Sequence, residues 1–171
     1  MSPEQSRKIT PGNVELLVLL GLYLIGFSLL AINPHDRADW AMENLFPIAQ
    51  LVAVIIAYRH FKFTRLAYYM IFIYLFLQSW GGHFTYAEAA PFNWLRDHFH
   101  LKRNDYDRLA HFMLGFLVAI PIREILMQVI QTSRRWLAFI TASIILAIGA
   151  FYELLNGGSR FSPRQIWEIS S

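Results

Sequence analysis

The stretch from Arg103 to His111 gathers acidic, basic and imidazole side chains at the start of a long apolar segment. Asp107 and His111 are four residues apart, so a helix would place both on one face. A carboxylate and an imidazole at this spacing can bind a divalent metal ion, or the carboxylate can orient the imidazole for proton transfer. Because charge at the mouth of a membrane helix is costly, the stretch indicates a functional site.

The same stretch is also compatible with a purely structural role. Asn104 or Asp105 can cap the start of a helix, where the helix dipole favours acidic side chains. Arg103 can pair with Asp107 one turn later, and the arginines can contact lipid phosphates. On that interpretation the residues begin a helix at the membrane surface and take part in no reaction.

Further polar residues are expected at the same membrane boundary. Glu153 lies in the last turn of the final apolar segment, roughly 25 Å along its helix, at the depth of His111. The connection that holds His83, Tyr86 and Glu88 leaves an earlier apolar segment at that boundary too. We therefore expect His111 and Glu153 to lie close together on antiparallel neighbours.

These residues divide by what each side chain can do. The candidate catalytic residues, which can exchange a proton, are His83, Glu88, Asp107, His111 and Glu153. A divalent metal ion would be bound by Asp107, His111 and Glu153. The candidate substrate-binding residues are Tyr86, Arg103 and Arg108. The alternative for Glu153 is a charge at a helix end that reaches water, and for His83 an ordinary loop histidine.

Arg123 and Glu124 form a separate polar pair, about 18 to 20 Å beyond His111 along the same helix. Pro121 just before them frees a backbone carbonyl that Arg123 can help to satisfy. We predict a structural ion pair between Arg123 and Glu124, or a phosphate anchor, near the opposite membrane face.

The composition predicts that these residues are held in a membrane protein. Of 171 residues, 56% are hydrophobic and only 16% are charged, with the apolar residues concentrated in long runs. The absence of cysteine excludes disulfides, cysteine-bound zinc and thiol nucleophiles. The net charge of +3 is spread over short loops and forms no basic stripe for nucleic acid. The expected partner is the lipid bilayer, with a lipid head group or a small polar solute at the polar cluster.

The apolar runs predict an all-α polytopic bundle of about five transmembrane helices, because a barrel would show short alternating segments instead. Gly81-Gly82 is expected to break the third span, and Pro47 lies in the first turns of the second. The domains are a cytoplasmic N-terminus (1–13), a transmembrane domain (14–155) and a polar tail (156–171). The predicted spans are 14–32, 42–58, 66–80, 107–130 and 136–155.

The basic residues of the short connections indicate the orientation. Arg59, Lys62 and Arg65 fall on the same side as the N-terminus and as the pair Arg134-Arg135. Because basic loops stay in the cytoplasm, the N-terminus is predicted to be cytoplasmic and the polar cluster to lie at the outer face.

Four motifs in this order resemble the YjdF-like bacterial inner-membrane proteins, a family of unknown function. They are His83-Phe-Thr-Tyr-Ala-Glu88, Arg103-Asn-Asp-Tyr-Asp-Arg-Leu-Ala-His-Phe112, Arg123-Glu124 and Phe151-Tyr-Glu-Leu154. The resemblance implies a multi-pass protein of the bacterial plasma (inner) membrane, with no settled activity. A shorter similarity, over Asp107-Arg-Leu-Ala-His-Phe112, is to VanZ-like membrane proteins.

The chain departs from the family's pattern after Leu155. Relatives continue with further acidic residues and another span, whereas here Asn156-Gly-Gly and a short polar tail follow. The tail is therefore expected to be truncated or frame-shifted, and if the missing carboxylates belong to the site, the chain is expected to be inactive. Three roles follow from the residues: a membrane enzyme acting on a lipid or polyprenyl head group, a protein that binds or conducts a small solute or ion, and a structural protein.

Overall fold

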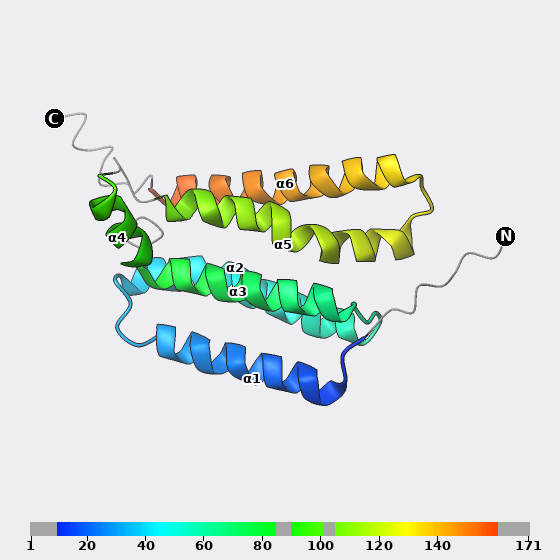
Figure 1. Cartoon of the computed structure of the whole chain (residues 1–171), viewed down its shortest axis with the longest axis horizontal. Helices are drawn as coiled ribbons and strands as arrows, with labels where there is room; N and C mark the ends of the chain where they lie inside the picture. The colour runs from blue at the N-terminus through cyan, green and yellow to red at the C-terminus, as the bar shows by residue number, and fades with distance from the viewer. Residues whose placement is uncertain (1–9, 85–89, 101–104, 161–171) are drawn as a thin grey trace.

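The computed structural model describes residues 10–84, 90–100 and 105–160, and within these ranges it contains α-helices and no β-strand (Figure 1). The expected all-α bundle is confirmed. Long apolar segments form helices because a helix satisfies its own backbone hydrogen bonds, which lipid cannot do. The helices are α1 (Asn13–Leu30), α2 (Arg37–Tyr58), α3 (Arg65–Phe84), α4 (Ala90–His98), α5 (Tyr106–Val129) and α6 (Arg134–Arg160).

The long helices run side by side, and the short α4 lies at one end of the bundle (Figure 1). α3 packs against α1, α2 and α5, and α6 packs against α5. We call the end that contains α4, the end of α3 and the start of α5 the "α4 end". The other end, which contains the connections 59–64 and 130–133, is called the "basic end".

Within the described ranges, four helices are long and apolar enough to cross a membrane: α1, α2, the Arg108–Val129 part of α5 and the Arg134–Leu154 part of α6. The third predicted span corresponds to α3, whose tyrosines and buried Gln78 and Ser79 lower its hydropathy. α3 packs on three other helices, so these polar side chains face protein. The Ser79 hydroxyl, for example, is hydrogen-bonded to the Tyr23 hydroxyl of α1 at 3.1 Å.

Gly81-Gly82 does not break α3, contrary to the sequence prediction, and both glycines are buried inside the helix. A β-carbon added at Gly82 would lie 2.8 Å from Nδ2 of Asn44 and 3.1 Å from Cβ of Glu43, both on α2. Gly82 therefore permits close packing of α3 against α2, a use that glycine commonly has between membrane helices.

Other helix bounds differ from the prediction by a few residues. α2 begins at Arg37 because the Asp36 carboxylate accepts hydrogen bonds from the backbone N–H groups of Ala38 at 2.7 Å and Asp39 at 2.9 Å. These bonds lower the pKa of Asp36 below its ordinary value. α6 continues to Arg160, and α4 occupies part of the connection between the third and fourth predicted spans.

Candidate functional site

The centre of the candidate site is a contact between His111 of α5 and Glu153 of α6. Nε2 of His111 lies 2.8 Å from Oε1 of Glu153, and the side chains are 39% and 60% exposed. His111 precedes the connection 130–133 by about as many residues as Glu153 follows it, so antiparallel packing brings both to one level. The expected proximity is therefore present, at the α4 end. A carboxylate in this position can orient an imidazole and stabilise its protonated form.

Glu43 of α2, which sequence reasoning did not select, joins this cluster. Its carboxylate accepts a hydrogen bond from the hydroxyl of Tyr152, the residue before Glu153. The Tyr152 ring also packs against Phe46 of α2, with ring centroids 5.5 Å apart. The signal available in the sequence was the charge of Glu43 within an apolar segment, which by itself marks a candidate site.

A small cavity of about 30 Å³ lies beside His111, between α2, α3, α5 and α6. Its polar lining comes from His111, Tyr152, Gln78 and Tyr74, and the Gln78 amide donates to the Tyr74 hydroxyl at 2.5 Å. A space of this size, which is lined mostly by apolar atoms with these four polar side chains, has room for a water molecule or an ion of similar size.

His83 lies at the α4 end but makes its contacts with another part of it. Its Nδ1 is 2.6 Å from the backbone oxygen of Leu30, and its own backbone oxygen accepts a hydrogen bond from the His35 N–H at 3.0 Å. His83 thus joins the end of α3 to the end of α1 and the connection to α2. These contacts give it a structural role beside its predicted catalytic one.

Arg108 precedes His111 by three residues, so both lie on one face of α5. Its Nη1 is 3.1 Å from Oδ1 of Asp105, and both side chains are at least partly exposed. Asp105 occupies the N-cap position of α5, as the structural interpretation predicted, but its side chain makes no capping hydrogen bond.

Four predicted site positions lie outside the described residues or side chains. These are Tyr86, Glu88, Arg103 and the side chain of Asp107. Their predicted roles, including an Arg103–Asp107 pair, stay predictions. Among the described residues no group of three metal-binding side chains comes together, and His111 with Glu153 supplies two of the three predicted donors.

Tyr106, inside the stretch from Arg103 to His111, holds the start of α5 in place. It is buried, its hydroxyl donates to the backbone oxygen of Leu77 at 2.7 Å, and its ring packs on Phe92 of α4. Part of this motif is therefore structural, since Tyr106 joins α5 to α3 and α4.

Glu124, at the basic end, was expected to pair with Arg123, and the structure gives it a different partner. The buried Glu124 carboxylate accepts hydrogen bonds from the Thr64 N–H at 2.9 Å and the Thr64 hydroxyl at 2.5 Å. Successive helical residues point in different directions, so Arg123 is exposed while Glu124 faces the unsatisfied N–H groups at the start of α3.

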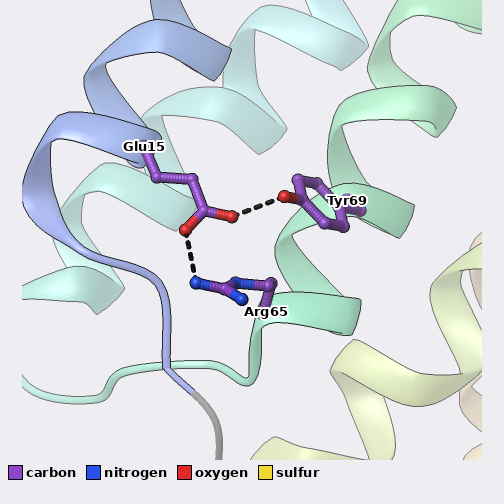
Figure 2. A network of polar contacts seen from close by, with 3 residues as sticks. All are labelled: Glu15, Arg65 and Tyr69. Atoms are coloured by element: carbon purple, nitrogen blue, oxygen red, sulfur yellow. Dashed lines mark hydrogen bonds and ion pairs between the residues drawn. The ribbon is translucent and has the colours of Figure 1, made fainter.

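A second polar network at the basic end joins α1 to α3 (Figure 2). The Glu15 carboxylate contacts Arg65 at 2.9 Å and accepts a hydrogen bond from the Tyr69 hydroxyl at 2.5 Å. Arg65 and Tyr69 are four residues apart on one face of α3, so one carboxylate can reach both.

Four helices able to cross a membrane, with a histidine–carboxylate pair at one end, define a multi-pass helical membrane protein. The chain belongs to the DUF2238 family, described as predicted membrane protein, which matches residues 15–159. It is 35% identical over 127 residues to inner membrane protein YjdF of Escherichia coli (strain K12).

The match to YjdF covers 73% of this chain, and the chain spans 60% of the length of that relative. No solved structure matches the chain. The resemblance to YjdF-like proteins is confirmed, and with the apolar helices it places the chain in the bacterial inner membrane as a multi-pass protein.

Proposed function

We propose that this protein is a membrane enzyme that carries out acid–base chemistry on a lipid or polyprenyl head group at its α4 end. The observation that carries the proposal is the 2.8 Å contact between His111 and Glu153 on neighbouring helices. Both side chains are partly exposed, so a substrate can reach them from the surface of the bundle.

The pair supplies the parts that proton transfer requires. His111 accepts the proton of a water molecule or head-group hydroxyl as that oxygen forms a bond to the phosphorus of a head-group phosphate. It then donates the proton to the oxygen that leaves as its own bond to phosphorus breaks. Glu153 holds the imidazole in position and stabilises it while it is protonated. Arg108, on the same face of α5, offers positive charge to a head-group phosphate.

The position of the pair favours a head group as substrate. The described part of the α4 end also carries exposed Trp94 on α4, a residue type enriched at the membrane–water interface, and exposed Phe99 just after it. At that level a head group is held near the site by its own acyl chains.

The proposed orientation has the N-terminus in the cytoplasm and this site at the outer face. This orientation is supported by the exposed basic side chains at the basic end, which are Arg59, Lys62, Arg65, Arg134 and Arg135. The α4 end mixes acidic and basic side chains, as the Arg96–Asp97 and Arg108–Asp105 pairs illustrate.

The test compares the lipids of bacteria that produce the wild-type chain, His111→Gln or Glu153→Gln. His98→Gln is the matched control because it removes an imidazole from the same end, where His98 stacks on Trp94. We expect wild type and control to cause a head-group change, detected by mass spectrometry of phospholipids and polyprenyl phosphates, which both site variants lose. Circular dichroism of the purified variants should match wild type.

Identical lipid profiles with wild type and His111→Gln would overturn the proposal. Unfolding of both site variants would instead assign the pair a packing role. The alternative is a protein that binds or conducts a small solute or ion, for which the cavity beside His111 offers room for a species about as large as water. Thermal stabilisation of the detergent-solubilised protein by a small ion, lost in Glu153→Gln, would favour that alternative.

A further inference from the structure

An apolar groove of about 410 Å³ lies between α1, α2 and α3. Of these helices, α1 lies on the side of the bundle opposite α6 (Figure 1). Most of its lining is aliphatic or aromatic, including Leu16, Leu20, Leu51, Ile55, Phe72 and Leu75. α1 and α2 each pack mainly against α3, which leaves the space between them for the groove. The groove is open to the surface of the bundle, so in a membrane an acyl chain of a lipid can enter it.

The groove has the depth of a single membrane leaflet. Along α1 it extends from Asn13, at the helix start, to Tyr23, which is about 15 Å at helical rise. That length is about half the thickness of a bilayer's hydrocarbon core. The groove thus begins at the membrane surface at the basic end and reaches the middle of the bilayer.

The surface end of the groove is polar and positively charged. The Tyr58 hydroxyl donates to the Asn13 side chain at 2.7 Å, and both residues line the groove. The Lys62 ammonium lies 5.3 Å from the centre of the Tyr58 ring, and Arg59 follows Tyr58 directly. Lys62 and Arg59 are both exposed. The contact with Tyr58 places the Lys62 ammonium where an apolar chain entering the groove would carry its head group, and Arg59 lies at the same end of α2.

We propose that this groove binds an anionic phospholipid of the leaflet at the basic end. One acyl chain lies between α1, α2 and α3, and the phosphate contacts Lys62 and Arg59. This site is at the opposite end from His111 and Glu153, so it does not depend on the proposed function.

Charge, rather than apolar area, would select the lipid. An acyl chain gains little by leaving other acyl chains for an apolar groove, because both surroundings are apolar. A basic side chain near the membrane surface favours an anionic lipid by roughly fivefold, so two such side chains predict a preference of about 25-fold.

The experiment measures lipid binding to the full chain in detergent by native mass spectrometry, with phosphatidylglycerol and phosphatidylcholine of identical acyl chains. The test variant is Arg59→Gln/Lys62→Gln. Its matched control is Arg134→Gln/Arg135→Gln, which removes the same charge from the same end, at the start of α6. A second test variant, Leu20→Trp, fills the groove, and its control is Leu146→Trp on the exposed face of α6.

We expect wild type and Arg134→Gln/Arg135→Gln to bind phosphatidylglycerol at least tenfold more tightly than phosphatidylcholine. The preference should fall to about twofold in Arg59→Gln/Lys62→Gln, and Leu20→Trp should weaken binding of both lipids whereas Leu146→Trp should not. Equal binding of both lipids by wild type overturns the proposal. So does an equal loss in the two double variants, because the lipid would then respond to net charge alone.

Discussion

The contact between Glu124 and Thr64 should be a major stabilising contact between α5 and α3. Glu124 is buried and accepts two hydrogen bonds from Thr64, which itself caps α3 by accepting from the Ala67 N–H at 3.3 Å. The perturbation is Glu124→Ala, which leaves both Thr64 donors without this acceptor. It also removes a negative charge from the start of a helix, where the helix dipole favours it.

The magnitude follows from the number and kind of bonds lost. Hydrogen bonds between membrane helices average about 0.6 kcal/mol and reach about 1.7 kcal/mol, and bonds to a charged group belong to the stronger ones. Two such bonds give about 3 kcal/mol for Glu124→Ala. Glu124→Gln keeps one acceptor oxygen and should cost about half as much, roughly 1.5 kcal/mol.

The assay is reversible unfolding in mixed micelles with increasing denaturing detergent, followed by circular dichroism. A double-mutant cycle of Glu124→Ala with Thr64→Val isolates the hydroxyl bond, and the expected coupling is about 1 to 1.7 kcal/mol. Thr64→Ser keeps the hydroxyl and is the matched control. Arg123→Ala should change the free energy of unfolding by less than about 0.5 kcal/mol. A coupling below about 0.5 kcal/mol, or an Arg123→Ala cost equal to that of Glu124→Ala, would refute the reasoning.

Two further predictions use the same unfolding assay. Gly82→Ala should destabilise the protein by about 1 to 3 kcal/mol because the added β-carbon would meet α2. Gly21→Ala is the control and should be neutral or stabilising, since there is open space around Gly21. Equal stability of the two variants would contradict close packing at Gly82. The lowered pKa of Asp36 means that its stabilising contribution is present above about pH 4 and is lost as pH falls through the lowered value. Between about pH 6 and pH 3, wild type should therefore lose more stability than Asp36→Asn, because asparagine still caps α2 but does not titrate. Equal losses of stability in the two proteins would rule out a stabilising role for the Asp36 carboxylate.

Local patterns predicted the helices well where the signal lies within one segment. The start of α5 at Tyr106 and the end of α2 at Tyr58 fall within one residue of the predicted bounds, because polar residues interrupt the apolar runs there. The position of His111 and Glu153 at the same height along α5 and α6 was also predicted by counting residues. The helical rise per residue is constant, and a short connection makes the two helices antiparallel.

The features that were missed depend on a partner from elsewhere in the chain. Gly81-Gly82 has the composition of a helix break, and only the approach of Asn44 and Glu43 shows why Gly82 lies within α3. The bond from Tyr152 to Glu43 joins residues that are 109 positions apart. Nothing local to either residue specifies that contact.

The sequence by itself determined the class of structure, because the length and apolarity of a segment decide whether it forms a helix suited to the bilayer. It also determined the level of each polar residue along its helix. Only the tertiary structure decided which residues face each other, because that depends on the rotation of each helix and on its neighbours. Hence Glu153 meets His111 as the residue count predicted, whereas Glu124 turns from adjacent Arg123 to Thr64 on another helix.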